Sequence, residues 1–335
     1  MTPFSVPLAA FLGISTVAGV PPVECARLLC ALLALIVPHR ELVLALVGLA
    51  LLRRGRNGML DGPSLGWGML LAAHAVSTWA SPRSPAVFVF LGMAAFLLGG
   101  VWPFCASWLA SDEGWGRRVG RGVLSIHFLG IVLPSVNPVA VEAWAPWALF
   151  MPALGLVWGG ALALSPSGQR SSLSLLWFYE LQLMALFILG TRGGRPETAV
   201  LLLWAIILPM AVLVATQAGS GRSATGHRTA QCAAGFALAS LMAVPGLVGF
   251  AARFSAVATL LGSSPAGLAC YAAGLLVLPA LLRPLRDEMR SASLTLRTAA
   301  TTAAATIGVI LLGVLPGLSS GTWRGAGLWR FLLKG

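Results

Sequence analysis

Long apolar runs, each about the length of a membrane-spanning helix, follow one another along almost the whole chain. A soluble domain carries about 25% charged residues, whereas only 10% of these 335 residues are charged, 58% are hydrophobic, and the mean hydropathy is +0.88. This composition predicts an integral membrane protein. Because lipid offers no hydrogen-bond partners to the backbone, the spans are predicted to be helices in an all-α, polytopic transmembrane bundle.

Twelve apolar segments can be delimited, and short connections rich in Gly, Pro, Ser and Arg separate them. The segments are Phe4–Val20, Val23–Val37, Glu41–Leu52, Ser64–Ala80, Pro85–Leu109, Val119–Val136, Val139–Leu164, Ser172–Gly190, Glu197–Gln217, Ala230–Leu261, Ala266–Leu282 and Thr298–Leu318. The second and third form either two short spans or one helix kinked at Pro38, so eleven or twelve helices are expected. No domain boundary is evident, and residues 1–335 are predicted to form a single transmembrane domain.

The basic residues are distributed unevenly between the two predicted sides of the membrane. With twelve spans, 14 arginines fall in loops after odd-numbered spans or within the first five residues of the next span, 7 basic residues fall in the other loops and the tail, and Arg253 lies deep within a span. The positive-inside rule then places both termini outside, in a membrane such as the bacterial inner membrane. The net charge of +12 is therefore explained by loop arginines that orient the spans in the membrane, and no nucleic-acid partner is expected. The tail, residues 321–335, suits either a helix lying in the membrane interface or a frayed end.

Cofactor and metal sites are not expected within this chain. The sequence contains neither a Walker loop nor a dinucleotide fingerprint. Its five cysteines form no C-x-x-C pair and no Cys/His cluster with metal-ligand spacing. No polar stretch is long enough for a soluble catalytic domain.

Four ionisable side chains are predicted to lie inside the bilayer, where charge is costly and marks candidate functional residues. They are Glu180, His127, Arg253 and His74. Glu180 at this depth either pairs with a cation or carries a proton. Both states suit a proton relay, and a neutral Glu hydrogen-bonded to a neighbouring helix is the alternative. Each histidine is either a second relay member or a packing residue. Because arginine keeps its proton, Arg253 can only influence its neighbours or hold a carboxylate, in a functional or a structural ion pair.

A break is predicted in the apolar run that contains Arg253. Pro245, Gly246 and Gly249 interrupt it a few residues before the arginine. Backbone groups freed by such a break are tolerated at membrane depth only where protein or water covers them. Broken helices of this kind commonly mark ion pathways in transporters.

Four segments together resemble the antiporter-like subunits of respiratory complex I, membrane-bound hydrogenases and Mrp-type cation/proton antiporters. Ala243–Phe254 resembles the family segment G-[IL]-P-P-x-x-G-F-x-x-K-F, with Arg253 at the position of its Lys. Trp102–Leu109 resembles [QF]-F-P-F-H-x-W-L, with Cys105 at the His position. Leu154–Gln182 resembles the stretch ending in S-x-S-Q-L-G, and Ile310–Gly317 resembles the last helix, I-L-L-G-L-x-P-G. The segments follow the family's order over about residues 85–320.

The resemblance implies a proton-channel-like membrane-arm subunit of a multi-subunit, redox-driven, complex I-like assembly. Its partners would be other membrane and peripheral subunits within a lipid bilayer. Any quinone, flavin or iron–sulfur cofactor would lie on those partner subunits, and any enzymatic activity would belong to the whole assembly.

Two departures from the family keep two alternatives open. The family has about fourteen helices and a row of mid-membrane Lys, Glu and His that moves protons, whereas Leu98 stands here at one of its Lys positions. The only lysine of this chain is Lys334, in the tail. The chain is therefore expected to be a proton-channel-like subunit, with a non-pumping structural subunit or a free-standing secondary transporter as the alternatives.

Overall fold

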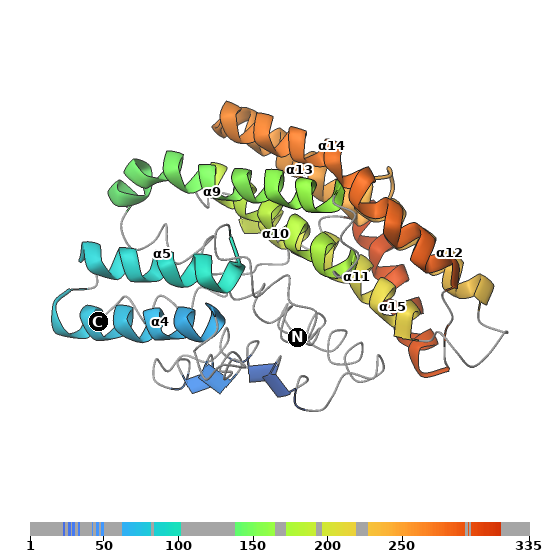
Figure 1. Ribbon diagram of the computed structural model, residues 1–335, viewed down its shortest axis with the longest axis horizontal. Coiled ribbons are helices and arrows are strands. Elements are labelled where there is room, and N and C mark those ends of the chain that lie inside the picture. The colour runs from blue at the N-terminus through green and yellow to red at the C-terminus, as the bar shows by residue number, and fades with distance from the viewer. Residues whose placement is uncertain are drawn as a thin grey trace.

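The computed structural model describes most of the chain after residue 61. The described ranges are 62–81, 84–101, 138–164, 172–191, 196–218, 227–291, 294 and 296–315, with isolated helical positions between residues 23 and 49. Within them the chain is helical and has no strand, which confirms the predicted all-α bundle (Figure 1). The predicted spans 4–20 and 119–136 and the tail 321–335 lie outside these ranges.

The helices match most of the predicted segments in that part of the chain. They are α4 (Gly62–Trp79), α5 (Pro85–Gly99), α9 (Pro138–Leu164), α10 (Ser172–Gly190), α11 (Pro196–Ala218), α12 (His227–Leu241), α13 (Val248–Ser263), α14 (Pro265–Glu288), the short 3-10 helix η3 (Met289–Ser291) and α15 (Leu296–Val314). By length and composition, α10 and α14 are each able to cross a membrane, and five shorter apolar helical stretches accompany them.

Two predicted segments are interrupted in the structure. The run 85–109 was expected to be one span, but α5 ends at Gly99 because Gly100 adopts a left-handed conformation (φ 60°) and its N–H caps the Phe96 carbonyl. The run 230–261 is divided into α12 and α13, as the predicted break requires. Glycine and proline thus divide apolar runs that hydropathy alone would leave continuous.

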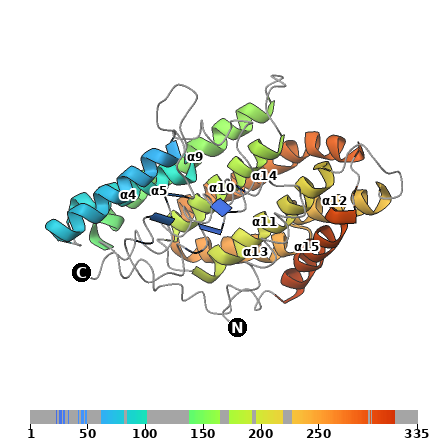
Figure 2. The same ribbon diagram turned by 90° about the horizontal axis from the view of Figure 1, so that it is seen from below.

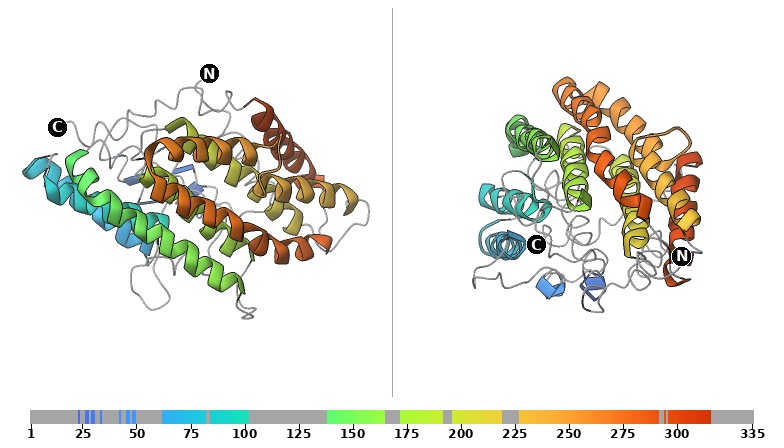
Figure 3. Two further views of the ribbon diagram at one scale, coloured as in Figure 1. Left: turned by 90° about the horizontal axis from the view of Figure 1, so that it is seen from above. Right: turned by 45° about the vertical axis from the view of Figure 1, so that its right-hand side comes forward.

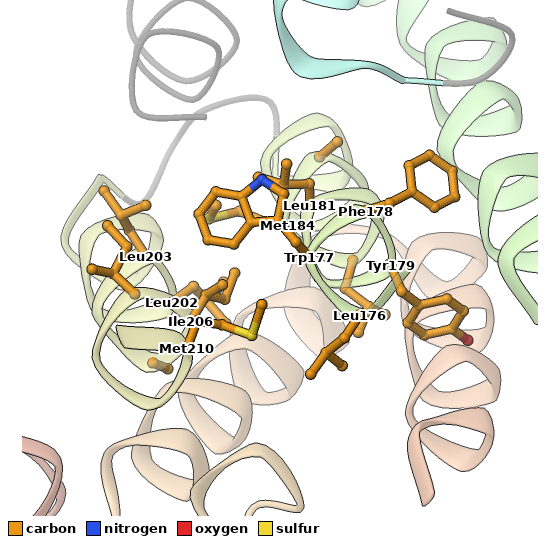
Figure 4. Close-up of a cluster of buried hydrophobic side chains, with 14 of the residues drawn as sticks. Leu176, Trp177, Phe178, Tyr179, Leu181, Met184, Leu202, Leu203, Ile206 and Met210 are labelled. Atoms are coloured by element: carbon orange, nitrogen blue, oxygen red, sulfur yellow. The ribbon is translucent and has the colours of Figure 1, made fainter. Parts of the chain in front are cut away.

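Helix α10 forms the centre of the bundle. Every residue from Leu173 to Gly190 is buried, which fits a helix that is apolar on all sides. Figure 4 shows Trp177 and Met184 on the side of α10 that faces α11, and Tyr179 directed toward another helix on the opposite side. That helix is α14, because the Tyr179 hydroxyl donates a hydrogen bond to the Gly274 carbonyl at 2.9 Å.

Glycines allow the helices around α10 to approach it closely. A Cβ placed at Gly159 of α9 would lie 2.8 Å from Cδ2 of Tyr179, and one at Gly274 of α14 would lie 2.7 Å from Cδ2 of Leu183. Small residues at such contacts are typical of helix packing in membranes. Helices α4 and α5 lie side by side at one edge of the bundle (Figure 2).

A polar cluster joins four helices at one end of the bundle. Glu288, the last residue of α14, accepts hydrogen bonds from Ser172 Oγ at 2.6 Å and from Gln217 Nε2 at 2.8 Å. Gln231, in the first turns of α12, donates to the Arg290 carbonyl at 3.0 Å. The beginnings of α10 and α12 and the ends of α11 and α14 therefore meet. These helix ends border three of the arginine-containing loops that the positive-inside count places on one side of the membrane.

We expect Gly159→Ala to destabilise the protein by about 1–3 kcal/mol, because the new methyl group would collide with the buried ring of Tyr179. Gly68→Ala in α4 is the matched control, since a Cβ there has no neighbour within 4 Å. Thermal unfolding in mild detergent measures both. Equal stability of the two variants would contradict the close α9–α10 contact.

Candidate functional site

An ion pair buried in the bundle joins α13 to α10. Arg253 Nη2 of α13 donates a hydrogen bond to Glu180 Oε1 of α10. The two residues are only 4% and 3% exposed. A buried charge is stabilised only by a well-placed partner and further hydrogen bonds, so each residue depends on the other.

The same guanidinium also contacts the end of α12. Arg253 Nη1 donates to the Leu241 carbonyl and, at 3.3 Å, to the Ser240 carbonyl. The last carbonyls of a helix lack intrahelical partners and carry partial negative charge, which a cation satisfies. The planar guanidinium can therefore hold the carboxylate of one helix and the carbonyl end of another together.

Helix α12 ends in a Schellman motif, which occupies the Ser240 carbonyl with one hydrogen bond and leaves the Leu241 carbonyl to Arg253. Ala243 is left-handed (φ 58°), and its N–H donates to the Ser240 carbonyl at 2.9 Å. The Val244 N–H donates to the Ala239 carbonyl at 3.0 Å. These two bonds define the motif, in which glycine is the usual left-handed residue.

The predicted break follows directly after this motif. Pro245 has no N–H with which to continue a helix, and Gly246 is left-handed (φ 86°). Helix α13 then begins at Val248, and the preceding Leu247 is extended and provides no side-chain cap. Pro245 and Gly246 therefore lie in the connection itself, as the sequence predicts.

Two glycines from different sequence segments pack against the break. Gly249 donates its N–H to Ser240 Oγ at 3.1 Å, and a Cβ there would overlap the Ser240 carbonyl. In α15, a Cβ at Gly313 would overlap the Gly246 carbonyl and the Leu247 backbone. The break is thus held between α12 and α15, and only residues without a side chain permit this approach.

Two further buried polar side chains each have one atom without a hydrogen-bond partner among the described residues. Tyr271 of α14 interacts electrostatically with both Arg253 and Glu180, and its buried hydroxyl has no hydrogen-bond partner among the described residues. Gln182 donates from Nε2 to the Gly100 carbonyl at 3.2 Å, while its Oε1 likewise lacks a partner in that part of the chain. The sequence offers no signal for Tyr271 or Ser240, because both are far from Glu180 along the chain and only the fold brings them near.

Of the four predicted site residues, the structure joins Glu180 and Arg253. His74 lies in α4, which lies apart from α13 in the bundle (Figure 1), and no hydrogen bond among the described residues connects it with the pair. Its Nδ1 is buried, without a partner in the described ranges. His127 lies outside those ranges. Across the same ranges, no three His, Cys, Asp or Glu side chains are grouped to hold a metal ion.

No protein-family model and no curated protein sequence matches the chain. Three solved membrane complexes contain chains with a similar fold. A chain of respiratory complex I from Thermus thermophilus with bound aureothin is 17% identical, with a TM-score of 0.65 over 93% of this chain and 90% of that one. A chain of the Mrp complex from Dietzia sp. DQ12-45-1b is 15% identical, with a TM-score of 0.65 over 98% of this chain and 82% of that one. A chain of the membrane-bound sulfane sulfur reductase, an archaeal respiratory membrane complex, is 14% identical. Its TM-score is 0.61 over 97% of this chain and 82% of that one.

These comparisons support, at the level of fold, the resemblance found in the sequence motifs. The similarity extends over nearly the whole chain, including parts beyond the four motifs. The chain therefore shares its fold with chains of these membrane complexes.

We expect Glu180→Leu and Arg253→Met each to destabilise the protein by about 3–5 kcal/mol, because each leaves a buried charge without its partner. The double variant should lose clearly less stability than the sum of the two single losses, since neither charge remains. It should not recover fully, because the α12 carbonyls also lose their donor. Additive losses, measured by thermal unfolding in detergent, would show that the two side chains act independently.

Proposed function

We propose that this chain is a membrane subunit of a multi-subunit, ion-translocating assembly related to complex I and the Mrp complex. The observation that carries this proposal is the shared fold over 93–98% of the chain with chains of such complexes. Energy coupling, including any quinone, flavin or iron–sulfur chemistry, would belong to partner subunits. A free-standing secondary transporter receives less support, because each of the three similar folds belongs to a complex.

Within this assembly, the geometry around Glu180 fits a structural role best. Arg253 retains its proton under ordinary conditions, and its contacts hold α10 and the end of α12 at the same time. A relay step at Glu180 would require the carboxylate to leave this arginine. We therefore favour a structural subunit of the membrane arm, in which the ion pair fixes the broken helix.

Proton relay through Glu180 is the second candidate, and a specific observation favours it. The Tyr271 hydroxyl, which interacts electrostatically with the ion pair, and Gln182 Oε1, on the same helix as Glu180, are both buried without a hydrogen-bond partner among the described residues. Unsatisfied polar groups at membrane depth are costly and are retained where they serve a function. His127 would be a further relay member.

Isolation of the tagged chain in mild detergent tests the assembly proposal. We expect other membrane subunits and at least one energy-coupling subunit to co-purify, and mass spectrometry identifies them. A chain that purifies alone and drives substrate-dependent proton uptake in liposomes would instead be a secondary transporter.

We expect Glu180→Gln to leave proton translocation per assembled complex unchanged, because in the structural role no proton passes through this carboxylate. The amount of complex should fall, since the amide leaves the Arg253 charge unpaired. The measurement is proton uptake into proteoliposomes, divided by the amount of assembled complex. Glu288→Gln, at the end of the bundle, is the control. Loss of translocation in the Glu180 variant alone would establish the relay role.

A further inference from the structure

Helix α14 presents a long outward face at the edge of the bundle. Only a third of its apolar stretch is buried, whereas α10 is buried throughout (Figure 3). The residues exposed along this face are small or apolar. They are Ala269, Ala272, Ala273, Leu276, Pro279 and Ala280. Their spacing of three and four residues places them in one stripe along the helix.

The stripe leads into a group of arginines at the end of the helix. Arg283, Arg286 and Arg290 continue the same spacing and are exposed, and Arg228 of α12 is also exposed. The Gln231–Arg290 hydrogen bond brings the first turns of α12 to this point. We call these four arginines the α14 cationic end.

The acidic side chains near these arginines do not neutralise their positive charge. Arg228, Arg283 and Arg286 form no ion pair within the described ranges, and Arg290 faces Asp287 at 3.7 Å with both side chains largely exposed. Both carboxylate oxygens of Glu288 accept hydrogen bonds from Ser172 and Gln217. The surface therefore complements an anion.

The length of α14 places the arginines at the membrane surface. Arg283 lies 18 residues after Pro265, or about 27 Å along the helix, and the hydrocarbon core is about 30 Å thick. When Pro265 is at one boundary of the core, the arginines reach the phosphate level at the other. The positive-inside count assigns them to the cytoplasmic leaflet, where anionic lipids gather.

We propose that the α14 cationic end binds the phosphate of an anionic phospholipid, whose acyl chain lies along the Ala269–Ala280 stripe. The arginine fork matches a phosphate, which offers several oxygens in suitable geometry. The stripe gives the acyl chain an apolar surface on which four alanines lie beside Pro279 and one protruding side chain, Leu276, which is 82% exposed. This site does not depend on whether the chain conducts protons.

Lipid titration of the purified full-length protein, followed by native mass spectrometry, tests the proposal. Phosphatidylglycerol should bind more tightly than phosphatidylcholine. The triple variant R283Q/R286Q/R290Q should weaken phosphatidylglycerol binding about tenfold or more, because each arginine near the surface contributes to headgroup attraction. The variant R283K/R286K/R290K should keep most of the binding and shows that the helix end still folds.

The matched control is R53Q/R54Q/R56Q, which removes equal charge from another loop assigned to the same membrane side. It should leave phosphatidylglycerol binding unchanged. Equal loss in both glutamine variants would mean that only general charge attraction operates, and this would overturn the site. The proposal would also fail if the two lipids bound equally. It would fail as well if R283Q/R286Q/R290Q released an acidic protein partner without altering lipid binding.

Discussion

The bridge that Arg253 makes between Glu180 and the end of α12 is the interaction on which the centre of this structure depends. A broken helix inside a membrane exposes carbonyl groups that neither lipid nor the helix itself can satisfy. Here one guanidinium satisfies the Leu241 carbonyl, adds a second bond to the Ser240 carbonyl, and also neutralises a carboxylate of the central helix. The break and the ion pair therefore stabilise each other, and neither is expected to persist without the other.

Close backbone packing completes the arrangement. Gly249 and Gly313 allow α12, α15 and the connection before α13 to approach to backbone contact. Gly159 and Gly274 do the same for the neighbours of α10. Since lipid provides little hydrophobic force between helices, such close contacts and the buried hydrogen bonds supply much of the association. The polar centre lies in a bundle whose helices approach closely at these glycines.

The position of Arg253 has a consequence for ion transport. The family that the motifs resemble carries a lysine at this place, and a desolvated lysine can release its proton, whereas arginine essentially cannot. An arginine fixed by a carboxylate and two carbonyls suits a permanent structural connection. The buried Tyr271 hydroxyl, which lacks a hydrogen-bond partner among the described residues, is the feature that favours the alternative of a relay through Glu180.

The sequence by itself determined the class of the protein, most helix boundaries and the break at Pro245–Gly246, because apolar length, proline and glycine act locally. It also singled out Glu180 and Arg253, since charge within an apolar run is conspicuous without a structure. Only the tertiary structure decided that these two residues meet, that the same arginine caps α12, and that Tyr271 interacts electrostatically with both. His74 shows the same limit, because its place in an apolar helix was predictable and its separation from the ion pair was not. Helix packing sets which faces meet, and residues on α10, α12, α13 and α14 carry no local signal of their partners.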